Sequence, residues 1–121
     1  MSYLEDTEAA LIAQGITDPI FIGYMPESPD VCITLLPIAS RIFNPAMCQD
    51  EEEYRIQVWY RGTKYGFAAG HATLTSIFGI LHRNVFSGRT YFAEMTAPIS
   101  MGLDDNDRHL LVLDFRMIGV E

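Results

Sequence analysis

Residues 54–61, YRIQVWYR, alternate between two kinds of side chain and predict the central strand of a sheet. Ile56, Val58 and Tyr60 point to one side and are expected in the core. The other side presents Arg55, Gln57, Trp59 and Arg61. A tryptophan between two arginines on a polar face suits a protein interface. Gly62 ends the strand.

The segment that follows, residues 65–82, has the apolar periodicity of the main helix. Gly66, Gly70 and Gly79 fall within it, and each costs about 1 kcal/mol relative to alanine in a helix. They indicate either close packing against the sheet or weak helical turns. Two more strands are expected at 89–95 and 110–118, joined through an apolar turn at 98–103 and a polar turn at 104–107.

On the N-terminal side, Ser2 and Glu5 form a capping box for a short helix that Gly15 ends. Residues 19–24 are extended, and residues 31–36 predict a strand closed by Pro37. The polar stretch from Ser40 to Glu53 is longer than an ordinary hairpin loop, so it is functional or mobile.

These elements predict an α+β fold with a mixed, mostly antiparallel sheet of about five strands and two main helices packed against it. The length of 121 residues is that of one domain, spanning 1–121. Hydrophobic residues make up 49% and charged residues 20%, which is a globular balance. The abundance of Met, Tyr and Phe fits either a core alone or a core plus a subunit interface.

The net charge of −8 argues against a DNA-binding module. It is explained either by a solvated acidic face or by a surface past which DNA slides without sticking. No apolar run is long enough to cross a bilayer. The acidic residues Glu5, Asp6 and Glu8 stand where a signal peptide needs basic ones, so we expect a cytosol-like compartment.

No catalytic apparatus is recognisable, and the chain is not expected to be an enzyme or to need a cofactor. It has no nucleophile elbow, phosphate loop or dinucleotide fingerprint. Cys32 and Cys48 are too few for a disulfide framework or a zinc site. The oxygen-rich run 104–109 suggests a calcium ion, but it lacks the required glycine and glutamate, and Asp and Asn favour turns by themselves. A small ligand- or metal-binding domain around this run is therefore the less favoured alternative.

Three segments carry a resemblance to a known family. They are YRIQVWYRG at 54–62, the Ala-rich helix leading to FSGRTYF at 86–92, and PISMGLDDNDRHLLVLDFRM at 98–117. In their order and spacing they resemble the tail terminator proteins of long-tailed bacteriophages, a group also labelled minor capsid or head-tail joining proteins. The stretch 40–53 has no matching signature.

The resemblance implies a structural virion protein that forms a homohexameric ring at the head-proximal end of the tail tube. Such a ring ends tail polymerisation and joins the tail to the head connector. Its partners would be copies of itself, the tail tube protein and the connector. Phage DNA would pass through the lumen without sequence-specific binding. The location implied is the neck of the virion, after assembly in the host cytoplasm. Another head-to-tail completion protein, docking on the portal, is the alternative within the virion.

A ring needs two different complementary patches on each subunit. We hypothesise a basic, Trp-containing patch that meets acidic surface of the next copy, with no catalytic and no metal-binding residue. The candidate interface residues are Glu51, Glu52, Glu53, Arg55, Trp59, Arg61, Arg89, Asp104, Asp105, Asp107 and Arg108.

Overall fold

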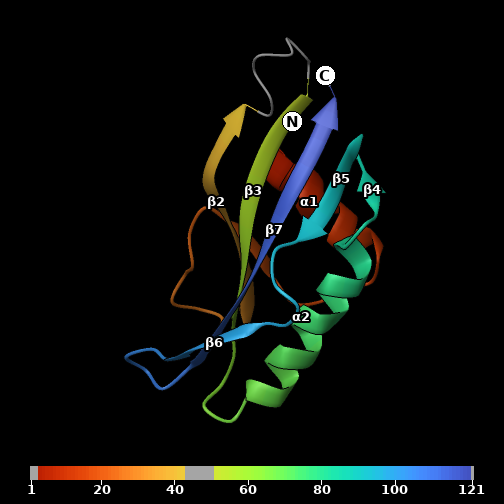
Figure 1. Cartoon of the computed structure of the whole chain (residues 1–121). Coiled ribbons are helices and arrows are strands. Elements are labelled where there is room, and N and C mark those ends of the chain that lie inside the picture. The colour runs from red at the N-terminus through yellow and green to blue at the C-terminus, as the bar shows by residue number, and fades with distance from the viewer. Residues whose placement is uncertain (1–2, 43–50, 121) are drawn as a thin grey trace.

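A computed structural model describes residues 3–42 and 51–120, and side chains within 3–38 and 54–118 (Figure 1). The described elements are α1 (Tyr3–Ala13), β1 (Ile20–Ile22), β2 (Cys32–Ile42), β3 (Glu51–Arg61), α2 (Phe67–Leu81), β4 (Val85–Phe86), β5 (Arg89–Ala93), β6 (Ile99–Leu103) and β7 (His109–Val120). Neither described helix is both long and apolar enough to span a bilayer.

The described strands form one mixed, seven-stranded sheet in the order β1-β2-β3-β7-β5-β4, with β6 paired to β7. Only β1 and β2 run parallel among these pairs. The prediction of about five strands is therefore wrong. The segment 19–24, expected to be extended, contains β1, whereas β4 and β6 were missed. β4 has two residues, too few to show periodicity, and 98–103 was interpreted as a turn.

The first misinterpreted segment is 31–36, which the sequence predicted to be a strand that ends at Pro37. Instead β2 continues to Ile42, with Pro37 opposite Ile56. Pairing of β1 with β2 ends at Leu35, so Pro37 lies where β2 is a free edge and the missing N–H is tolerated. The expected loop 40–53 shrinks accordingly, because 40–42 belong to β2 and 51–53 to β3; residues 43–50 lie outside the described part.

The second misread segment is 98–103, expected as a turn. It forms β6, antiparallel to the first residues of β7, with a bulge between Ser100 and Gly102. Gly102 has a φ of 84°, a backbone conformation that glycine adopts without steric cost.

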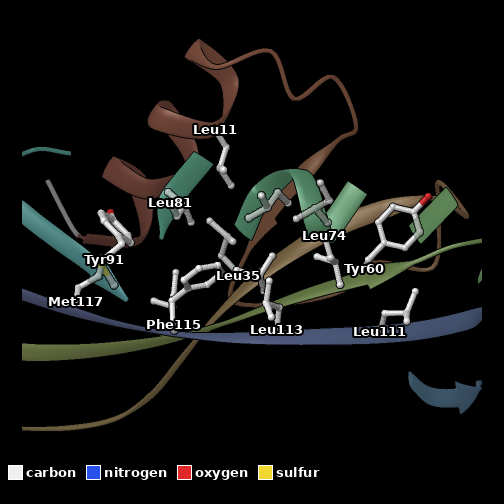
Figure 2. Packing of buried hydrophobic residues seen from close by; sticks show 14 residues of the cluster. Leu11, Leu35, Tyr60, Leu74, Leu81, Tyr91, Leu111, Leu113, Phe115 and Met117 are labelled. Atoms are coloured by element: carbon white, nitrogen blue, oxygen red, sulfur yellow. The ribbon is translucent and has the colours of Figure 1, made fainter. Parts of the chain in front are cut away.

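The core lies on one face of the sheet, under both helices. Figure 2 shows Leu11 of α1 and Leu74 and Leu81 of α2 facing Phe115 and Leu113 of β7. The alternating residues Ile56, Val58 and Tyr60 are buried there, as predicted. The remaining members of the buried cluster are Ile33, Leu35, Ile77, Tyr91, Leu111 and Met117.

Helix α2 touches the sheet most closely at Gly70. A Cβ at this position would lie 2.5 Å from Leu111 Cδ1 and 2.6 Å from Tyr60 Cδ1. Gly70 therefore marks close packing, whereas Gly79 has nothing within 4 Å.

Polar contacts attach α1 to β5. Thr7 is fully buried; its hydroxyl donates to Tyr3 O (2.8 Å), so the Tyr91 hydroxyl donates to Thr7 Oγ1 (2.7 Å). Arg89 forms an ion pair with Asp6 (2.9 Å) and lies over the Tyr54 ring. This candidate interface residue thus serves to dock α1 on the sheet.

Candidate interaction surface

The opposite face of the sheet carries neither of the two described helices and bears the candidate residues Arg55, Trp59 and Arg61. Because side chains alternate along a strand, Arg55, Gln57, Trp59 and Arg61 of β3 all lie on this helix-free face. Their neighbours across β3 and β7 are Arg116, Asp114, Val112 and Leu110. Neighbours on β2 are Ile38, Leu36, Thr34 and Cys32.

Arg61 is not part of an open surface, because the loop between β1 and β2 folds over it. Its exposure is 2%. The guanidinium donates from Nε to Asp30 O (2.9 Å) and from Nη2 to Pro29 O (2.6 Å). The sequence expectation of an exposed Arg61 differs from this placement, since strand alternation cannot reveal a covering loop. Arg61 acts as the support of that loop.

Arg108 holds the same loop from the other side and is likewise buried, at 7% exposure. Its Nη1 donates to Glu27 O (2.8 Å) and its Nε to Asp104 Oδ2 (2.8 Å). The Asp30 and Glu27 carboxylates lie 3.4 Å from its terminal nitrogens. This candidate, too, organises the surface from beneath.

Asp104 closes the turn between β6 and β7. Its Oδ1 accepts the backbone N–H groups of Arg108 and Asn106, both at 2.9 Å. The Arg108 N–H, joined by that of Asn106 and by the Arg108 guanidinium, holds the pKa of Asp104 below its ordinary value. Turn geometry thus accounts for Asp104 without an ion. Within residues 3–42 and 51–120, no cluster of His, Cys, Asp and Glu could hold a metal.

The two arginines bring two acidic loops together, although these are remote in sequence. We call the result the acidic lip: Glu27, Asp30, Asp104, Asp105 and Asp107. Glu27 and Asp30 side chains are 85% and 69% exposed, and Asp105 and Asp107 are exposed as well. In the described part of the chain, the guanidinium that contacts these carboxylates is that of Arg108, which meets Glu27, Asp30 and Asp104, so the lip keeps a net negative charge.

An apolar row runs across the helix-free face beside the acidic lip. We call it the aromatic stripe: Phe21, Tyr24, Trp59, Val112 and Ile99. Sheet register aligns Phe21 with Thr34, Thr34 with Trp59, Trp59 with Val112, and Val112 with Ile99. Tyr24 packs edge-on against Phe21. The ends of the stripe are open, with Tyr24 60% and Ile99 47% exposed, whereas Val112 is buried at 6% and Thr34, which lies between Phe21 and Trp59, is fully buried.

Trp59 is held in place within the stripe. Its indole Nε1 donates to Gln57 Oε1 at 3.0 Å, and the residue is half-buried. An indole whose polar atom is already satisfied presents its ring without a desolvation cost for that N–H. The interface role that the sequence pattern indicated for Trp59 stays a prediction.

Beyond the aromatic stripe, several charged side chains occupy the centre of the helix-free face. Arg55 Nη2 lies 2.9 Å from Glu94 Oε1. Asp114 lies beside this pair, and its Oδ1 is buried without a hydrogen-bond partner. Burial, and next the charge of Glu94, raise the pKa of Asp114, although Arg55 and Gln57 act in the opposite direction. The folded state would be more stable if this partly buried carboxylate were uncharged.

The remaining candidates, Glu51, Glu52 and Glu53, begin β3, and their side chains lie outside the described part of the chain. Sequence reasoning missed Glu27, Asp30 and the edge strand β6. A loop carboxylate gives no signal of its own in a sequence, because what gathers it is the distant pair of arginines. The alternation of Ile99, Met101 and Leu103 was the available signal for β6.

One sequence family matches most of the chain. The family described as bacteriophage tail terminator protein matches residues 10–121, from α1 through β7. This chain belongs to the bacteriophage tail terminator family. The tail terminator is thus a component of the virion tail, and its family is structural rather than enzymatic. No curated protein matches the sequence.

Proposed function

We propose that this tail terminator forms a homohexameric ring on the head-proximal end of the tail tube, ends tube polymerisation there, and joins the tail to the head connector. Residues 1–121 act as one domain of that ring. Assembly occurs in the host cytoplasm, and the ring resides in the neck of the virion.

The observation that carries the proposal is the apolar surface left open on the subunit. Every residue of β6 is exposed, with Ile99, Met101 and Leu103 at 47%, 52% and 47%. β6 pairs only with β7 among the described strands, so its other edge presents free backbone donors and acceptors. Exposed apolar edge strands invite pairing with another chain. Together with the aromatic stripe, this surface suits docking to protein, not to a small substrate.

The net negative charge of the subunit supports the proposal that DNA passes through the ring. With a net charge of −8, the subunit repels a polyanion at long range. A lumen lined by such subunits lets the genome slide through without binding.

Light scattering tests the ring with purified protein, alone and mixed with tail tube protein. The monomer has a mass of 13.6 kDa. A species about six times heavier, free or on tube ends, is the expected result. Monomers that remain monomeric even with assembled tubes would exclude a ring.

A further inference from the structure

The cations of the chain are almost all occupied by partners within their own subunit. Arg55 and Arg89 hold carboxylates, and Arg61 and Arg108 hold the β1–β2 loop. Arg116 lies over the Phe92 ring. Two described cations, Lys64 and Arg83, are exposed and have no carboxylate partner within the described part of the chain.

Lys64 stands on a turn built to protrude. The segment 63–66, called the Lys64 turn here, links β3 to α2 and is closed by a hydrogen bond from Gly66 N to Thr63 O (2.9 Å). A Cβ on Gly66 would lie 2.9 Å from Thr63 N, so the tight turn needs glycine.

The Lys64 turn also carries an aromatic ring in water. Tyr65 is 88% exposed, the highest value among the large apolar side chains in the described residues. The Lys64 ammonium lies 5.8 Å from the centre of its ring. A tyrosine beside a cation is a combination typical of interface hot spots. The other free cation, Arg83, has no exposed aromatic ring beside it in sequence.

A surface of matching chemistry exists on the same subunit. The aromatic stripe supplies apolar and aromatic contact area, and the acidic lip borders it through the loop that Arg61 holds. Arg61 is two residues from Trp59 on the same face of β3, and its Nε bonds Asp30 O. An aromatic ring with an adjoining cation would meet apolar surface and carboxylates together.

The two surfaces are different patches of the subunit. The Lys64 turn leads into α2, which packs on the core face, whereas the stripe and the lip are on the helix-free face. A patch that pairs with a different patch on the next copy makes a head-to-tail contact, which closes into a ring when the rotation permits. In Figure 1 the turn leads into the lower end of α2, and β6 crosses at the same end of the sheet.

We infer that the Lys64 turn of one copy docks on the helix-free face of a second copy of this chain, with Lys64 against the acidic lip and Tyr65 on the aromatic stripe. This inference rests on the proposed ring and names the contact that builds it. The occupant is another copy because the chain itself offers the unpaired cation and the exposed ring that the negatively charged, apolar face would accept.

Zero-length crosslinking tests this contact directly, because Lys64 is the sole lysine of the sequence. A carbodiimide joins the Lys64 amine to a touching carboxylate. The assembled protein, made from equal parts of 15N-labelled and unlabelled copies, is crosslinked, digested and analysed by mass spectrometry. We expect mixed-isotope peptides linking Lys64 to Asp105, Asp107, Glu27 or Asp30.

Charge variants test the energetics of the same contact. Lys64→Glu should weaken self-association about tenfold or more, because it sets like charges together. Asp105→Lys, at an exposed residue of the lip, should weaken it likewise, and the double variant should recover most of the loss. Lys64→Arg keeps the charge and should assemble normally while losing the crosslink. Unchanged circular dichroism verifies that each variant folds.

Two results would overturn the inference, and they differ in what they leave standing. If oligomers form, but Lys64 crosslinks elsewhere and Lys64→Glu associates as tightly as the parent, the contact is wrong and the ring stands. If no oligomer forms alone or on tube ends, the contact and the ring fail together.

Discussion

Gly70 and Gly79 are the same residue type on the same helix, yet their surroundings give them opposite effects on stability. Gly70→Ala forces a methyl group against Leu111 and the Tyr60 ring, at 2.5 and 2.6 Å. We expect the free energy of unfolding to fall by about 1–3 kcal/mol, the usual cost of overpacking. Gly79→Ala meets no atom within 4 Å and should raise it by about 0.5–1 kcal/mol. Urea denaturation measures both; equal effects would contradict this packing.

Asp114 gives the helix-free face a pH dependence. Burial and Glu94 raise its folded pKa above the value of 3.8 expected in the unfolded chain. The unfolded state therefore loses its proton first as pH rises, so stability falls from pH 3.8 up to the folded pKa and the full penalty remains at pH 7. Asp114→Asn should be more stable than the parent at pH 7, with a difference that vanishes below about pH 3.8. Denaturation across this range measures it, and a difference independent of pH would contradict the assignment.

At the scale of elements, the long alternating strands and the main helix were predictable, and the short strands β4 and β6 were not. The residues of β3 and β7 alternate over enough positions to show their buried face, and Leu74, Ile77 and Leu81 mark the buried side of α2. In contrast, β4 has only two residues, so it exists as a strand only because β5 provides a partner. The burial of Arg61 was hidden for a related reason, since a loop remote in sequence covers it.

Because Arg61 holds the β1–β2 loop, we expect two arginine substitutions on the same face of β3 to have unequal effects on stability. Arg61→Ala removes two charge-assisted hydrogen bonds from a buried site and should lower the free energy of unfolding by about 2–4 kcal/mol. Arg55→Ala breaks an ion pair whose arginine is 36% exposed and should cost at most about 1 kcal/mol. Cleavage after Glu27 by a glutamate-specific protease should accelerate only in Arg61→Ala. Equal losses of stability in the two variants would show that the loop is not held this way.

At the scale of the whole molecule, the sequence pattern was sufficient for the family but not for the surface. The match over residues 10–121 agrees with the resemblance carried by the segments at 54–62, 86–92 and 98–117. The acidic lip, in contrast, arises only when Arg61 and Arg108 bring residues 27–30 beside residues 104–107. Sequence reasoning placed Trp59 and the acidic turn on the surface as separate features, and the fold makes them neighbours.

The central claim is that this subunit stops tail growth by capping the tube. Electron microscopy of particles from the encoding phage with this gene deleted tests it most directly, with the wild-type chain supplied in trans as the control. If the subunit caps the tube, tails of the deletion strain have abnormal and variable length and are detached from heads, and complementation restores normal tails. Tails of normal length in the deletion strain would contradict it, and unsealed heads without any defect in tail length would assign the chain to the connector instead.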